Sequence, residues 1–252
     1  MNQLDFSLIE KSNLQNVSTL LINQSNVTEE EVLQNGCHKM INTPTRGLSV
    51  SRNLAIKNAE SDICLISDDD ELFVDNLEQK ILSAYKQLPK ADVIIFKISN
   101  RHTKLGRKTK QLKKIELLTV SSWQISFKTQ SIISNNINFD KKLGAGSGNG
   151  ASEENKFLLD CYKKGLKIYF VPTEIASLRD QQSTWFMGFT KEYFFNRGKT
   201  TRYILGRFWA TLYAFYFLIF KHNEYKKDIS FFEAKKYLFK GLKVKDIDAK
   251  LD

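Results

Sequence analysis

An apolar run that ends in three aspartates is the feature that most constrains how this chain folds. Ile63-Cys64-Leu65-Ile66 is apolar at successive positions, and Asp68-Asp69-Asp70 follow after a single serine. A strand with consecutive apolar residues is typical of a sheet interior covered on both faces. In open α/β sheets, ligands bind beyond the carboxyl ends of the strands. The run therefore predicts a buried central strand that delivers a carboxylate cluster to a binding edge.

Short apolar runs alternate with helix-like segments through the first half of the chain. Strands are predicted at residues 17–22, 39–41, 62–67, 91–96 and 167–172, and helices at 5–13, 47–59 and 75–87. Thr28 followed by three glutamates predicts another helix start, because a hydroxyl cap and first-turn carboxylates satisfy exposed amides. This alternation is typical of an α/β fold with a mainly parallel central sheet flanked by helices, as in Rossmann-like domains.

Composition limits the classes of protein that fit. The 252 residues are 42% hydrophobic and 26% charged, which is ordinary for a globular chain. Three cysteines without a CxxC pair, and no evident signal peptide, favour a cytoplasmic location without disulfides. The three histidines are scattered, which disfavours a zinc site of His and Cys ligands. The net charge of +10 is concentrated after Lys191, without an assignable nucleic-acid recognition element, so nucleic acid is not an expected partner.

The acidic cluster predicts a metal site. Neighbouring carboxylates repel one another, so a cation is expected to compensate them. Asp68 and Asp70 offer hard oxygen ligands of the kind that Mg²⁺ and Mn²⁺ prefer, together with phosphate oxygens. The alternative is an exposed Asp-rich turn leading into the next helix.

The chain resembles the family-2 glycosyltransferases of the GT-A fold, which belong to the nucleotide-diphospho-sugar transferase superfamily. The resemblance lies in Gly47-Leu48-Ser49-Val50-Ser51-Arg52-Asn53 and in the apolar strand that ends in an Asp-x-Asp motif. It implies that Asp70 ligates the metal and that Asp68 contacts the donor ribose or the metal shell. It further implies a donor site containing Asp69, Arg52 and Asn53, with Arg52 at the diphosphate or base. Arg52 as an ordinary surface arginine is the alternative.

A glycine-dense loop and a pair of glutamates form the second predicted constellation. The resemblance implies that a carboxylate at the start of the following helix, Glu153 or Glu154, is the catalytic base, and that loop residues Gly146 and Gly148 approach the acceptor. Helix geometry places Glu154 on the apolar, inward face and Glu153 nearer solvent, so Glu154 is the preferred base. A carboxylate at a helix N-terminus is expected to stay ionised at neutral pH. The alternative is that both glutamates only complement the helix dipole.

The last quarter of the chain is basic and aromatic. Residues 208–220 carry no charge, which is too short a stretch to span a bilayer. Flanking cations between residues 197 and 227 favour a peripheral contact with the inner face of the cell membrane, and packing on the catalytic domain is the alternative. We therefore expect a GT-A-like catalytic domain at 1–180, with a donor/metal half at 47–73 and an acceptor/base half at 143–172, and a helical segment at 181–252.

These features predict an inverting, metal-dependent glycosyltransferase. It would transfer a sugar from a nucleotide-diphospho-sugar to a hydroxyl of a cell-surface glycan or a lipid-linked acceptor. A catalytically impaired scaffold and a nucleotidyltransferase are the alternatives. The first strand of the family fold is expected to be missing, which would leave two neighbouring strands without a partner between them.

Overall fold

The structure is a computed structural model that describes residue 3 and residues 5–149, 152–179 and 188–248. Its contacts divide the chain into two compact units. Unit 1 comprises residues 1–140 and 153–181, and unit 2 comprises residues 141–152 and 182–252. The glycine-rich loop thus groups with the C-terminal segment. A single domain boundary near residue 180 stays a prediction.

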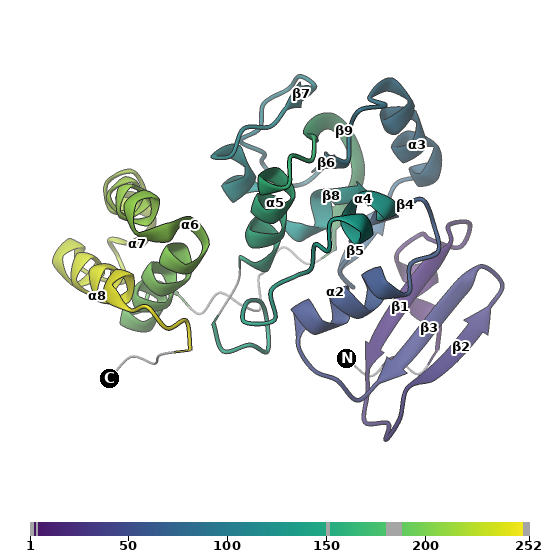
Figure 1. Ribbon diagram of the computed structural model, residues 1–252, viewed down its shortest axis with the longest axis horizontal. Coiled ribbons are helices and arrows are strands. Elements are labelled where there is room, and N and C mark those ends of the chain that lie inside the picture. Colours follow the sequence, from purple (N-terminus) through teal and green to yellow (C-terminus); the bar gives the residue numbers. More distant parts are fainter. Residues whose placement is uncertain (1–2, 4, 150–151, 180–187, 249–252) are drawn as a thin grey trace. The chain divides into compact units, whose positions relative to one another are not determined.

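Unit 1 contains all the strands of the described residues (Figure 1). In chain order its elements are α1 (Ser7–Lys11), β1 (Thr19–Gln24), β2 (Glu31–Asn35), β3 (His38–Thr43), α2 (Leu48–Lys57), β4 (Ile63–Leu65), β5 (Glu71–Phe73), α3 (Leu77–Gln87), β6 (Val93–Ile98), β7 (Lys110–Gln111), the 3-10 helices η1 (Glu116–Thr119) and η2 (Ser122–Gln124), β8 (Ile125–Lys128), α4 (Thr129–Ser134), α5 (Glu153–Lys163) and β9 (Ile168–Leu178).

The strands form two sheets rather than one. The smaller has the order β1-β3-β2, and the larger has the order β4-β8-β6-β9-β5, with β7 paired to β9. β1 and β4 are terminal strands of separate sheets. The α/β fold with flanking helices is confirmed, but the mainly parallel pairing is wrong. Among the strands of the described residues, only β1/β3 and β6/β9 are parallel, and the other pairs are antiparallel.

The strand that carries the acidic cluster is also less central than predicted. β4 pairs only with β8 and is half-buried along its length. The central position belongs to β6, whose strand residues are almost all buried. The apolar run at 63–66 is explained by packing beneath it, since Ile63 and Leu65 lie against the core cluster that includes Ile94 and Phe96.

Helices cover both faces of the larger sheet. On one face, the Tyr85 hydroxyl of α3 lies 3.1 Å from Ser126 Oγ on β8. The next residue, Phe127, points to the opposite face and packs against Phe157 of α5, with ring centroids 5.9 Å apart. Phe157 in turn stacks on Phe139 at 4.3 Å. This stack holds the start of α5 close to the chain that follows α4.

The helix predicted after Thr28 is wrong. Glu31–Asn35 is the exposed strand β2, which pairs antiparallel with β3. Asn35 and His38 flank a two-residue turn whose first position, Gly36, has φ of 60°. Glycine adopts that conformation without steric cost, and glycine at this position is typical of a tight hairpin. Pairing with β3 therefore outweighs the capping pattern at Thr28.

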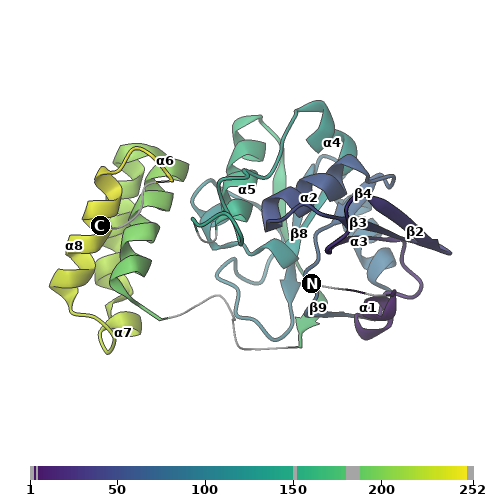
Figure 2. The same cartoon turned by 90° about the horizontal axis from the view of Figure 1, so that it is seen from below.

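Unit 2 is helical in its described residues. α6 (Lys191–Phe220), α7 (His222–Tyr225) and α8 (Phe231–Lys243) surround an aromatic core, and α6 and α8 lie side by side (Figure 2). α6 is broken at Gly206, which has φ of 75° and ψ of 169°. Gly198 and Gly241 let the two helices touch, because an added Cβ would lie 2.1 Å from a backbone oxygen of the other helix.

Candidate active site

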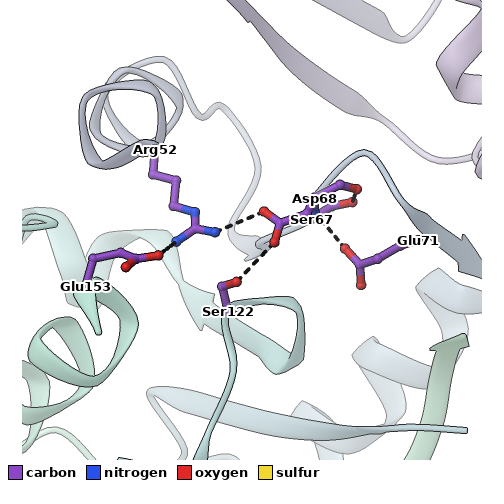
Figure 3. Close-up of polar contacts among 6 residues, drawn as sticks. All are labelled: Arg52, Ser67, Asp68, Glu71, Ser122 and Glu153. Atoms are coloured by element: carbon purple, nitrogen blue, oxygen red, sulfur yellow. Dashed lines mark hydrogen bonds and ion pairs between the residues drawn. The ribbon is translucent and has the colours of Figure 1, made fainter. Parts of the chain in front are cut away.

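Asp68 lies at the centre of a polar cluster at the end of β4 (Figure 3). Its Oδ1 accepts a hydrogen bond of 2.9 Å from Arg52, and its Oδ2 accepts one of 3.2 Å from Ser122. Its backbone N–H donates to Glu71 Oε2 at 2.8 Å. Both carboxylate oxygens of Asp68 are thus engaged, by side chains from two separate elements.

Arg52 links the aspartate cluster to the pair of glutamates at the start of α5. It extends from α2, donates to Asp68 through one terminal nitrogen and donates to Glu153 Oε1 at 2.9 Å through the other. Its guanidinium lies over the Phe139 ring at 5.3 Å, and the residue is only 7% exposed. Asp68 and Glu153 raise the pKa of Arg52 although burial opposes them. Arg52 is therefore a buried counter-charge and not a surface arginine.

The two glutamates at the start of α5 are placed in the reverse of the predicted order. Glu153 is buried, 4% exposed, and forms the ion pair with Arg52, whereas Glu154 is half-buried. Burial and the neighbouring Glu153 raise the pKa of Glu154 to about 8. The expectation that Glu154 stays ionised at neutral pH is wrong, since desolvation outweighs the helix dipole at this position.

Asp70 has one carboxylate oxygen without a partner among the described residues. This oxygen, Oδ1, is buried. Desolvation and the charge of Asp68 raise its pKa. A divalent cation would supply the missing partner, so Asp70 fits the predicted metal role better than Asp68, whose oxygens are taken. No group of three or more His, Cys, Asp or Glu side chains among the described residues is preassembled around a metal position.

The remaining predicted donor residues differ in environment. Asp69 is exposed, and its carbonyl accepts from Arg179. Asn53 instead binds the backbone of Phe139, with Nδ2 donating at 2.8 Å and Oδ1 accepting at 2.7 Å. Its side chain is thus used to fix the chain before the glycine-rich loop.

Gly146 and Gly148 belong to unit 2 and both have positive φ, 85° and 80°. Asp68 belongs to unit 1, so the two glycines and Asp68 lie in different units. Gly150, at the end of the loop, lies outside the described residues. The loop is anchored within unit 2: Asn149 donates to Asp248 Oδ1 at 3.1 Å, and Thr200 donates to the Asn149 carbonyl at 3.1 Å.

Sequence reasoning missed Ser122 and Glu71 as members of the cluster. Ser122 lies in a 3-10 helix within a stretch that shows no clear periodicity, so no sequence signal identified it. Glu71 directly follows the aspartates and is fully buried, with its pKa raised well above the usual range by desolvation. A fourth consecutive acidic residue was the available signal for Glu71.

The family model described as "Glycosyl transferase family 2" matches residues 22–144, which include Arg52 and the whole aspartate cluster. Residues 22–144 of this chain thus match a glycosyl transferase family 2 domain. The family resemblance drawn from the Arg52 helix and the Asp-x-Asp motif is thereby confirmed. No curated protein matches the chain significantly.

Solved structures of S. aureus TarS are similar in fold. TarS 1-349 in complex with UDP-GlcNAc has a TM-score of 0.50 and 16% identity, and the match covers 82% of this chain and 55% of TarS 1-349. A longer TarS structure gives a TM-score of 0.48 and 18% identity, covering 66% of this chain and 28% of that one. The chain thus spans about half, or less, of the structures it matches. The first of these likenesses supports the GT-A-like fold.

Proposed function

We propose that this chain is a glycosyltransferase that moves a sugar from a nucleotide-diphospho-sugar to a hydroxyl of a cell-surface glycan, with inversion at the anomeric carbon. The observation that carries the proposal is the buried Arg52 bridge between Asp68 and Glu153. It joins the strand end where family 2 places the donor to the helix start where the family places the base. UDP-GlcNAc, bound in a similar structure, is the first donor to test.

Of the two glutamates at the start of α5, Glu153 is the proposed catalytic base. The acceptor hydroxyl attacks the anomeric carbon, the bond from that carbon to the diphosphate breaks, and a carboxylate takes the hydroxyl proton. We assign Glu153 as this base, because Arg52 fixes its Oε1 and its buried Oε2 has no hydrogen-bond partner. Glu154, with its pKa raised to about 8, would be mainly protonated at pH 7.

The donor side rests on Asp70 and Asp68. Asp70 would hold Mg²⁺ or Mn²⁺ through its unpaired oxygen, and such an ion stabilises the negative charge of a departing diphosphate. Asp68, held in place by Arg52 and Ser122, would position the donor ribose. Asp69 is exposed beside them.

The acceptor and the location complete the proposal. The glycine-rich loop with Gly146 and Gly148 would let acceptor groups approach the backbone closely. A lipid-linked acceptor would fit a cytoplasmic enzyme that contacts the inner face of the cell membrane through residues 197–227. A catalytically silent scaffold and a nucleotidyltransferase remain the competing functions.

The test measures release of the nucleotide from UDP-GlcNAc and a panel of other sugar nucleotides, with and without Mn²⁺. We expect nucleoside diphosphate as the product, lost by more than about 100-fold in Asp70→Asn and Glu153→Gln. Asp62→Asn, an exposed carboxylate just before β4, is the matched control and should keep full activity. Pyrophosphate as the product would support the nucleotidyltransferase. Metal-independent turnover that is equal in all variants would sink the proposal.

A further inference from the structure

We propose that one face of α6 after its break inserts into one leaflet of an anionic membrane without crossing it. The inference extends the membrane contact proposed above and does not depend on the transferase chemistry. The inserting face consists of large apolar side chains that are between 46% and 72% exposed: Phe208, Trp209, Leu212, Phe215, Tyr216, Ile219 and Phe220.

The segment after the break is apolar on both sides. Its inner side packs into the unit 2 core through Ala210, Ala214, Phe217 and Leu218, which recur at helical spacing. With about 100° between successive helical residues, the exposed aromatic set falls on the opposite side. A surface helix in water would carry charged residues there. None occurs between Arg207 and Lys221.

The break at Gly206 limits the length of straight helix that is available for membrane insertion. Taken whole, Lys191–Phe220 is long and apolar enough to cross a membrane, by length and composition alone. The backbone at Gly206, however, is not helical. Before the break, Phe194 and Phe195 are buried and Gly198 lies against α8. The uncharged part that remains is about 20 Å long at 1.5 Å per residue, short of the roughly 30 Å core of a bilayer.

The charges around this face favour anionic lipid over a second copy of the chain. Exposed cations at the start of the segment, in the turn after it and on α8 outnumber the exposed acids there: Arg207, Lys226, Lys227, Lys235, Lys236, Lys240 and Lys243 against Glu224 and Asp228. Two copies meeting through the same face would bring like charges together. Anionic lipid headgroups complement these charges. Phe232 of α8, 79% exposed, adds a further apolar side chain.

The test is co-sedimentation of the full chain with vesicles of phosphatidylcholine, alone or mixed with phosphatidylglycerol. The decisive variant is Phe208→Ser with Phe220→Ser. Its matched control is Val32→Ser with Ile115→Ser, two apolar side chains of unit 1 that are 58% and 65% exposed. All substituted side chains are exposed, so circular dichroism and thermal unfolding should show that both variants fold. Donor turnover with a soluble acceptor, measured on the same samples, reports separately on the proposed function.

We expect binding to the mixed vesicles, weaker binding to neutral ones, and at least about a tenfold loss in the phenylalanine variant but not in the control. In a Trp123→Phe, Trp185→Phe background, the Trp209 emission should shift to the blue and be quenched by brominated lipid. Absence of vesicle binding, or equal binding by both variants, would overturn the inference. So would lipid-independent self-association that the phenylalanine variant abolishes, since that result would assign the face to a second copy.

Discussion

Arg52 and Glu153 lie 101 residues apart in the sequence, yet their side chains form an ion pair of 2.9 Å. Arg52 contacts Asp68 at the same distance with its other terminal nitrogen. A buried arginine between two carboxylates makes the geometry of each depend on the other. The end of the strand at Asp68 and the start of the helix at Glu153 are therefore coupled by one guanidinium.

Removing this guanidinium is expected to destabilise the fold. Arg52→Met leaves Glu153 buried without its counter-charge, and the loss of one partner of a buried ion pair costs about 3 kcal/mol. Urea unfolding followed by circular dichroism measures the change in free energy of unfolding. Arg46→Met is the control, because Arg46 is exposed and its bonds are to nearby loop atoms. Equal stability of the two variants would contradict the buried bridge.

The raised pKa of Glu154 predicts the direction of a pH effect on stability. The folded carboxyl, with a pKa of about 8 against 4.5 for the free side chain, binds its proton more tightly than the unfolded one. Stability should therefore fall as pH rises from about 4.5 to about 8 and then level off. Glu154→Gln should flatten this slope when the melting temperature is measured from pH 5 to 9. A slope remains from Glu71, whose pKa is raised in the same direction.

Asn53 is expected to act on the fold more than on the donor. Asn53→Ala removes both hydrogen bonds to the Phe139 backbone and should lower the free energy of unfolding by about 2 kcal/mol. Asn138→Ala, whose side chain makes only local, exposed contacts, should change it little. Donor affinity measured by calorimetry separates the two roles. If Asn53→Ala weakened donor binding without changing the free energy of unfolding, the result would support a donor-binding role for Asn53 and contradict this prediction.

The contact between α6 and α8 should not tolerate a methyl group. Gly198→Ala places a Cβ 2.1 Å from the Leu238 carbonyl oxygen, a backbone atom that moves only with its helix. Overpacking of this kind costs about 1–3 kcal/mol. Lys235→Ala on the exposed side of α8 is the control. If Gly198→Ala unfolds at the same temperature as the control, the helices are not in contact at this point.

The sequence predicted the helices and strands that depend on local residue patterns. It missed the contacts that depend on residues far away in the sequence. The helix around Arg52 and the strand β6 follow from periodicity and apolar runs, and both are confirmed. The burial of Glu153 depends on Arg52, and Asn53 finds its partner 86 residues away. Helix spacing places residues on a face, but it cannot identify the group that faces them.

The same limit explains the errors in the sheet. Three glutamates after Thr28 satisfy a helix-start pattern, but the hairpin through Gly36 pairs this stretch with β3 instead. β4 has the composition of a central strand and lies at a sheet edge, because apolar packing beneath it produces the same run of residues. Pairing direction is a property of the partner strand, which composition does not reveal.

The anchoring of Asn149 shows that neither unit of this protein is a continuous stretch of its sequence. Asn149 forms hydrogen bonds with Thr200 and Asp248, which lie far along the chain in the same unit. Glu153, only four residues after Asn149, belongs to the other unit. A chain shortened to end near residue 180 would keep every carboxylate of the candidate site but lose Thr200 and Asp248, the two anchors of the loop before Glu153.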